Sequence, residues 1–179
     1  MPSSLDEALD TLVRDIADWP DAGVVFRDVT PLLADAEGLR LTVEGLTALG
    51  RRIAGGDIDK VVGIEARGFI FGTPVAVALG AGFVPARKAG KLPALTHGVE
   101  YDLEYGSATV EIHQDALTPG DRVLVVDDVL ATGGTMAAVD ELIARTGAVP
   151  VANVVVLEIS ALGGRERLAH ERLGALRTY

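Results

Sequence analysis

The chain has 179 residues, of which 49% are apolar, 4% aromatic and 23% charged, and its formal net charge is −10. This length and apolar content predict one globular domain with a full core, while the acidic surface argues against nucleic acid and anionic membranes as partners. With no cysteine, no disulfide or thiolate metal site can form, and with no long apolar run or signal peptide the chain is expected to be cytoplasmic.

Two helices separated by a loop are predicted in the first third of the chain. Residues 4–17 begin with Ser4, a favourable N-cap, and repeat apolar residues at helical spacing. Residues 18–31 are interrupted by proline and glycine, which predicts a loop. The second helix is expected over residues 36–54, because a pair of glycines follows it.

Beyond residue 60, predicted strands and helices alternate, which indicates an α/β fold with a mostly parallel central sheet flanked by helices. In such sheets ligands bind beyond the carboxyl ends of the strands, so the residues there are the candidates for a site. The strands are expected at 60–64, 83–87, 122–126 and 149–158, the helices at 68–79, 134–145 and 164–172, and an antiparallel hairpin standing off the main body at 99–105 and 108–113.

The segment VLVVDDVLATGGT (residues 123–135) has the character of an anion cradle. Four apolar residues predict a buried strand, and Asp127 and Asp128 place two carboxylates at its carboxyl end. The glycines that follow let backbone N–H groups turn inward, and the start of a helix adds partial positive charge. Carboxylates beside such a cradle suit a sugar phosphate, although a plain helix cap at Thr132 is the alternative. The cradle is formed by Ala131, Thr132, Gly133, Gly134 and Thr135.

This pattern resembles the signature of the type I phosphoribosyltransferases. The resemblance implies that Asp127, Asp128 and residues 131–135 bind phosphoribosyl pyrophosphate. It also implies the fold of that family, in a single domain over residues 1–179. Within it, residues 1–35 would form an N-terminal helix and a hood over the base, and residues 95–113 a flexible hairpin over the site.

The segment GVVFRDVTPLL (residues 23–33) resembles the base hood of the adenine phosphoribosyltransferases. By that resemblance Phe26 stacks on adenine, and Val25 and Arg27 contact the edge of the base through their backbone. Stacking of an aromatic ring on a base contributes roughly 1–3 kcal/mol. The alternative is that Phe26 closes one end of the core.

Basic residues gather in two further segments that resemble the same family, GIEARGF (residues 63–69) and PARKAGKLP (residues 85–93). On so acidic a chain a local concentration of cations is a suitable place for pyrophosphate. Without the resemblance each of them would read as a solvated surface charge. The resemblance implies that pyrophosphate is bound by Arg67, Arg87, Lys88 and Lys91, some of them acting across a subunit interface.

The hairpin sequence YDLEYG (residues 101–106) also resembles that family, in which the glutamate of this loop is proposed to handle the purine proton. This points to Glu104 as the catalytic base, with an exposed hairpin acid as the alternative. The resemblance further implies Mg²⁺, held mainly by the substrate and through water by Asp127 and Asp128, and a homodimer.

The expected activity is transfer of the 5-phosphoribosyl group from phosphoribosyl pyrophosphate to adenine, giving AMP and pyrophosphate in purine salvage. One alternative is a phosphoribosyltransferase for another base, such as xanthine, guanine or orotate. Others are a non-catalytic sensor of phosphoribosyl pyrophosphate or nucleotide, and a catalytically silent subunit of an oligomer.

Overall fold

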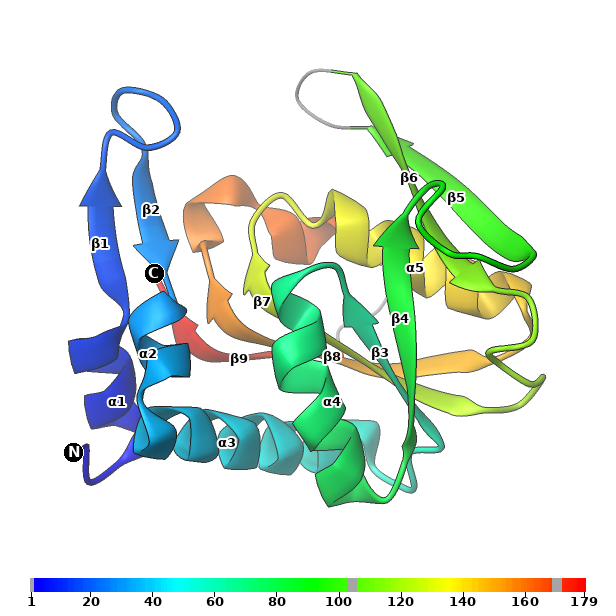
Figure 1. The fold of residues 1–179 in the computed structure, drawn as a ribbon, viewed down its shortest axis with the longest axis horizontal. Coiled ribbons are helices and arrows are strands. Elements are labelled where there is room, and N and C mark those ends of the chain that lie inside the picture. Colours follow the sequence, from blue (N-terminus) through cyan, green and yellow to red (C-terminus); the bar gives the residue numbers. More distant parts are fainter. Residues whose placement is uncertain (1, 103–105, 169–171) are drawn as a thin grey trace. The chain divides into compact units, whose positions relative to one another are not determined.

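The computed structural model describes residues 2–102, 106–168 and 172–179 (Figure 1). The chain divides into two compact units, Met1–Gly45 and Leu46–Tyr179. The long helix α3 (Ala36–Ala54) begins in the first unit and ends in the second, with the bounds expected from the sequence. No helix within these described ranges is both long and apolar enough to span a bilayer.

The first unit opens with helix α1 (Leu5–Leu12), which buries Leu9 and packs on the short helix α2 (Thr30–Ala34). As expected, Ser4 caps α1, because its side-chain oxygen accepts a hydrogen bond of 3.2 Å from the Glu7 N–H. The helix ends five residues earlier than the sequence predicts.

Residues 14–17 form a strand instead of a last helical turn. This strand, β1 (Arg14–Ala17), pairs antiparallel with β2 (Val25–Asp28) and sets Ile16 opposite Phe26. Ion pairs also join the strands, since Arg14 lies 2.5 Å from Asp28 and Arg27 pairs with Asp15. The predicted loop 18–31 therefore contains β2 and the start of α2.

A seven-stranded sheet forms the second unit, in the order β5-β6-β4-β3-β7-β8-β9. Strands β4, β3, β7, β8 and β9 run parallel, and β6 and β5 continue the sheet antiparallel. The strands are β3 (Lys60–Ile64), β4 (Gly82–Lys88), β5 (Thr96–Asp102), β6 (Ser107–His113), β7 (Arg122–Leu130), β8 (Val149–Glu158) and β9 (Leu173–Thr178).

Apolar, β-branched runs account for the middle of this sheet. Every residue of β8 from 151 to 158 is buried, as is every residue of β7 from 123 to 126. Such continuous runs are typical of parallel strands covered on both faces. The chain leaves β3 toward one side and β7 toward the other, so right-handed crossovers place α4 (Arg67–Leu79) and α5 (Gly134–Arg145) on opposite faces. Figure 1 shows α4 in front of the sheet and α5 behind it.

The structure confirms most of the expected elements and corrects several of them. Besides the early end of α1, the predicted hairpin does not stand apart, because β6 pairs with β4 at Arg87↔Glu111 and extends the sheet. Strand β7 continues to Leu130, so both aspartates lie within it. The helix expected over 164–172 is a 3-10 turn, η2 (Gly164–Arg167), preceded by η1 (Ser160–Leu162) and followed by the unexpected strand β9.

Candidate active site

The predicted anion cradle joins the end of β7 to the start of α5. Gly133 is the N-cap of α5 and adopts a left-handed backbone conformation with φ 78°, which glycine accommodates without steric cost. No side chain caps the helix, so Thr132 is not the N-cap and the alternative of a plain threonine cap is wrong. The first backbone N–H groups of α5 are therefore available to an anion.

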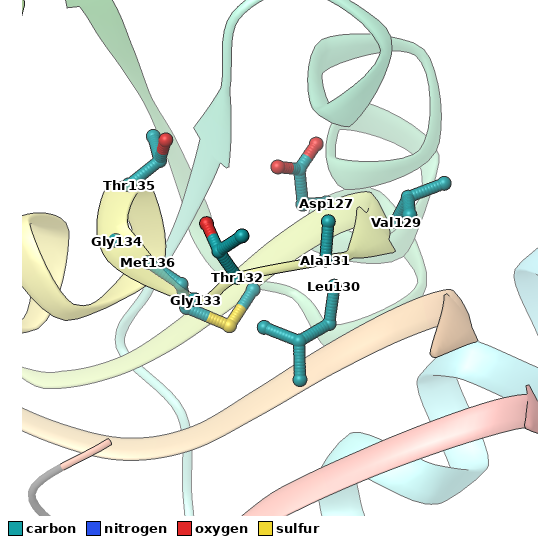
Figure 2. A pocket seen from close by; sticks show the side chains of 9 residues that line it. All are labelled: Asp127, Val129, Leu130, Ala131, Thr132, Gly133, Gly134, Thr135 and Met136. Atoms are coloured by element: carbon teal, nitrogen blue, oxygen red, sulfur yellow. The ribbon is translucent and has the colours of Figure 1, made fainter. Parts of the chain in front are cut away.

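A small pocket of about 100 Å³ lies at this loop (Figure 2). In Figure 2 the side-chain oxygens of Asp127, Thr132 and Thr135 point to the same side of the loop. Leu130 and Met136 are almost fully buried and fix the two ends of the loop in the core. The pocket therefore combines hydroxyl donors, a helix N-terminus and one carboxylate, in a volume that suits a phosphate group.

The two aspartates at the end of β7 have different partners. Asp128 is 6% exposed and accepts a hydrogen bond from Nε of Arg67. Asp127 lines the pocket, and its Oδ1 accepts a hydrogen bond of 2.9 Å from the Asp128 N–H. Desolvation of the Asp127 carboxyl, together with the negative charge of Asp128, raises the pKa of Asp127 well above its ordinary value.

This raised pKa gives Asp127 a measurable effect on stability. Over the pH range between the ordinary and the raised pKa, the folded chain keeps a proton that the unfolded chain has lost, so stability falls as pH rises through that range. Asp127→Asn removes this titration. We expect the variant to melt at a higher temperature than the unaltered chain at neutral pH and to show a flatter pH dependence. Thermal denaturation from about pH 4 to about pH 8 measures both.

The exposed Asp115, in the turn after β6, provides the control for this prediction. Asp115→Asn removes one carboxylate from the surface without touching the pocket, so its pH dependence should match that of the unaltered chain. Parallel melting curves for Asp127→Asn and the unaltered chain would contradict the raised pKa.

Arg67 begins α4 directly after strand β3, beside the end of β7. Strands β3 and β7 are hydrogen-bonded neighbours, with Gly63 opposite Val126. The approach of α4 is close, because a Cβ at Gly68 would lie 2.7 Å from the Val126 carbonyl oxygen and 3.0 Å from Oδ1 of Asp127. The peptide bond Glu65–Ala66 that precedes the helix is cis. Arg67 and both aspartates are thus brought together as the sequence predicts.

Glu65 contacts the predicted phosphate-binding residues at the end of β4 and just after it. Its carboxylate lies 2.5 Å from Nζ of Lys91 and 3.5 Å from Nε of Arg87, and it accepts a hydrogen bond of 3.0 Å from the backbone N–H of Lys88. Desolvation acts to raise the pKa of Glu65, but the hydrogen bond from Lys91 and those from Lys88 and Arg87 outweigh it and hold the pKa below its ordinary value. Glu65 was not among the predicted site residues, although an acid directly after a strand of the parallel sheet is a signal for a site.

The predicted base-binding residues lie in β2, in the first unit. Val25 is 49% exposed, and Phe26 is half-buried with the Trp19 ring edge-on to it, at a centroid distance of 4.5 Å and an interplanar angle of 68°. Asp28 was not among the predicted site residues; it is the last residue of β2 and is buried. Its pKa is lowered by the Thr30 N–H and by Arg14, which outweigh its desolvation.

The predicted catalytic base, Glu104, lies outside the described residues. The hairpin strands on either side of it are described, and β5 and β6 pair in register from Thr96↔His113 to Asp102↔Ser107. Near the last pair of this register the Ser107 hydroxyl donates a hydrogen bond to the Glu100 carboxylate.

Comparison with known proteins gives one consistent result. The family model of the phosphoribosyl transferase domain matches residues 35–170. Adenine phosphoribosyltransferase of Thermobifida fusca is 56% identical over 178 residues, 99% of each chain.

Two solved structures agree with this sequence match. Adenine phosphoribosyltransferase of Thermoanaerobacter pseudethanolicus superposes with a TM-score of 0.92 at 42% identity, covering 98% of this chain and 100% of the other. That of Saccharomyces cerevisiae, solved with adenine and an iminoaltritol bisphosphate, gives 0.89 at 36% identity and covers 94% and 96%. Together with the anion cradle, which we call the phosphate loop (residues 131–135), and the acids Asp127 and Asp128 before it, these likenesses establish that the chain has the type I phosphoribosyltransferase fold and belongs to the adenine phosphoribosyltransferase family.

Proposed function

We propose that this chain transfers the 5-phosphoribosyl group of phosphoribosyl pyrophosphate to N9 of adenine, releasing AMP and pyrophosphate. The observation that carries the proposal is the single edge of the sheet where the phosphate loop, the acids of β7 and the arginine of α4 meet. The bond from the anomeric carbon to the pyrophosphate oxygen breaks, the bond from that carbon to N9 forms, and the Glu104 carboxylate accepts the N9 proton. Each residue of the site has a role in one of these changes.

The leaving pyrophosphate is stabilised by Arg67, Arg87, Lys88 and Lys91. Negative charge grows on its oxygen as the bond breaks, and preorganised cations stabilise that charge most strongly in the transition state. Ion pairs support this role, because the Glu65 carboxylate holds Arg87 and Lys91 beside each other. Pyrophosphate then replaces one carboxylate as the partner of cations that are already in place.

The sugar phosphate binds at the end of β7. The backbone and hydroxyl groups of residues 131–135 hold the 5-phosphate, which is the group that the pocket in Figure 2 fits best. Asp127 and Asp128 orient the ribose hydroxyls, and the negative charge of Asp128 favours the positive charge that develops on the ring.

Mg²⁺ fits this donor set. It prefers oxygen ligands and commonly takes one or two carboxylates together with substrate phosphates. Of the two acids, Asp127 lines the pocket while Asp128 is engaged with Arg67, so Asp127 is the residue that would hold the ion, directly or through water. When bound, the ion would neutralise part of the negative charge of the pyrophosphate.

Adenine binds in the hood, where Phe26 stacks on the base and the backbone at Val25 and Arg27 contacts its edge. Phe26→Leu is expected to raise KM for adenine roughly 5–150-fold, the equivalent of ~1–3 kcal/mol of stacking. KM for phosphoribosyl pyrophosphate should stay within about twofold. Trp19 is the one tryptophan of the chain and touches Phe26, so adenine should change its emission, and a fluorescence titration measures the affinity directly.

Val24→Ala is the matched control for this prediction, since Val24 is an exposed apolar residue directly before β2. It should leave KM for adenine unchanged. An unaltered KM for adenine in Phe26→Leu would show that Phe26 serves the core and not the base.

We also propose that the chain forms a homodimer in the cytoplasm. An apolar strip on the outer face of α4 supports this, with Ile70 46% exposed and Val77 77% exposed two turns apart. A second copy of the chain would cover that strip, and the same helix begins with Arg67 of the pyrophosphate site. Light scattering at working concentration should give twice the chain mass of 18.6 kDa.

The experiment that tests the proposal is an assay of AMP formation from adenine, phosphoribosyl pyrophosphate and Mg²⁺, run beside hypoxanthine, guanine, xanthine and orotate. Turnover is expected with adenine alone. Turnover with a different base would refute the role of the hood and leave the phosphate loop intact. Binding of phosphoribosyl pyrophosphate without turnover of any base would contradict the enzymatic function.

A further inference from the structure

The phosphate loop, residues 131–135, rests directly on a second stretch of backbone near the C-terminus. We call this stretch, residues 160–167 with η1 and η2, the supporting turn. A Cβ on Gly133 would overlap the carbonyl oxygen of Gly164. A Cβ on Gly164 would overlap the carbonyl oxygen of Ala131 and lie 3.0 Å from the Gly133 nitrogen. With no side chain between them, any displacement of the supporting turn moves the loop.

One arginine anchors the supporting turn. Nε and Nη2 of Arg165 donate hydrogen bonds of 2.9 and 2.6 Å to the two carboxylate oxygens of Glu158, and Nη1 donates a third, of 3.1 Å, to the Leu173 carbonyl oxygen. A planar guanidinium can make this fork and a lysine cannot. Arg165 therefore ties the turn to β8 and β9 together.

The anchor point lies beside the start of the phosphate loop. Glu158 is the last residue of β8 and pairs in register with Leu130, the residue directly before the loop. Glu158 is also only 6% exposed, and a carboxylate so buried needs a charged partner. The loop is thus fixed on one side by its own strand and on the other by a turn that is tied to the neighbouring strand.

We propose that Arg165, held by Glu158, is a positioning residue for phosphoribosyl pyrophosphate, acting through the contact between Gly164 and the phosphate loop. This inference rests on the proposed function, because it takes the loop to bind the 5-phosphate. A backbone cradle binds an anion well only when its N–H groups are already in place. Without the paired hydrogen bonds of Arg165 the supporting turn is less firmly held. The loop must then be ordered when the substrate binds, and the free energy of ordering it weakens the affinity.

Arg165→Lys tests this by keeping the charge and removing the fork. Calorimetry with phosphoribosyl pyrophosphate and Mg²⁺ should show affinity reduced roughly tenfold to a hundredfold, with KM for that substrate raised in parallel. KM for adenine and kcat at saturation should stay within about twofold. Equal affinity in the variant and the unaltered chain, or an equal rise in both KM values, would overturn the proposal.

Gly164→Ala acts at the contact itself and leaves the ion pair intact. The φ of Gly164 lies outside the left-handed region, so alanine suits the backbone and only its Cβ is in conflict with the loop. The same selective loss of phosphoribosyl pyrophosphate affinity is expected. A lower melting temperature with unchanged affinity would show that the turn serves stability alone.

Arg145→Lys is the matched control, because Arg145 pairs with Glu141 on the exposed face of α5. Its affinity and kinetics should equal those of the unaltered chain, and a loss there like that in Arg165→Lys would overturn the assignment. If the unaltered chain itself fails to bind phosphoribosyl pyrophosphate, the proposed function fails and the inference with it. If the unaltered chain binds phosphoribosyl pyrophosphate and the variants Arg165→Lys and Gly164→Ala bind it equally well, the inference fails and the proposed function stands.

Discussion

Replacing Glu104 with glutamine is expected to lower kcat with adenine about 10²–10⁴-fold, the usual contribution of a general base. Glutamine keeps the size and polarity of the side chain but cannot take the N9 proton. Affinity for phosphoribosyl pyrophosphate should stay within about twofold, since the site proposed for that substrate lies at the ends of β3, β4 and β7. Steady-state kinetics give the first quantity and calorimetry the second.

Glu100 of the same hairpin is the control for this variant. Its carboxylate accepts a hydrogen bond from the Ser107 hydroxyl and has no part in the proposed chemistry. Glu100→Gln should leave kcat unchanged. An unchanged kcat in Glu104→Gln would assign the proton to another group, and an equal loss in both variants would indicate a general effect on the hairpin.

The second large effect is expected for Arg67→Gln, which removes a cation from the proposed leaving-group site at the start of α4. We expect kcat/KM for phosphoribosyl pyrophosphate to fall about 10²–10³-fold, as for other groups that stabilise developing negative charge. The variant also leaves the buried Asp128 carboxylate without its arginine. Melting temperature is therefore expected to fall as well.

A double variant separates these two consequences. Arg67→Gln with Asp128→Asn removes both charges of the pair, so it should recover melting temperature but not activity. Arg52→Gln, at the exposed end of α3, is the control for loss of one positive charge and should change neither quantity. Recovery of activity in the double variant would mean that Arg67 serves only to neutralise Asp128.

Elements whose signal is local were predictable from the sequence. Helix α3, strands β3 and β8 and helix α5 have the predicted bounds, because each is a periodic or continuous apolar stretch with a clear stop. The phosphate loop was predictable for the same reason, since its strand, acids and glycines lie within thirteen consecutive residues.

Elements that depend on distant partners were not predictable. Residues 14–17 continue a helical pattern, but pairing with β2 and the ion pair between Arg14 and Asp28 hold them as a strand. Strand β9 has only a short apolar run of its own and forms against the fully buried β8. The partners of Glu65 could not be identified from the sequence, because they lie in another strand or just after it, more than twenty residues later.

The pairing of β3 with β7 also indicates where the chain should tolerate insertions or new termini. Arg67 and Asp128 are 61 positions apart along the chain, yet their separation in space is set by two hydrogen-bonded strands about 4.8 Å apart. The length of the connecting chain does not enter into that geometry. Insertions, or new termini made by circular permutation, in the exposed turn between β6 and β7 should therefore leave this half of the site assembled.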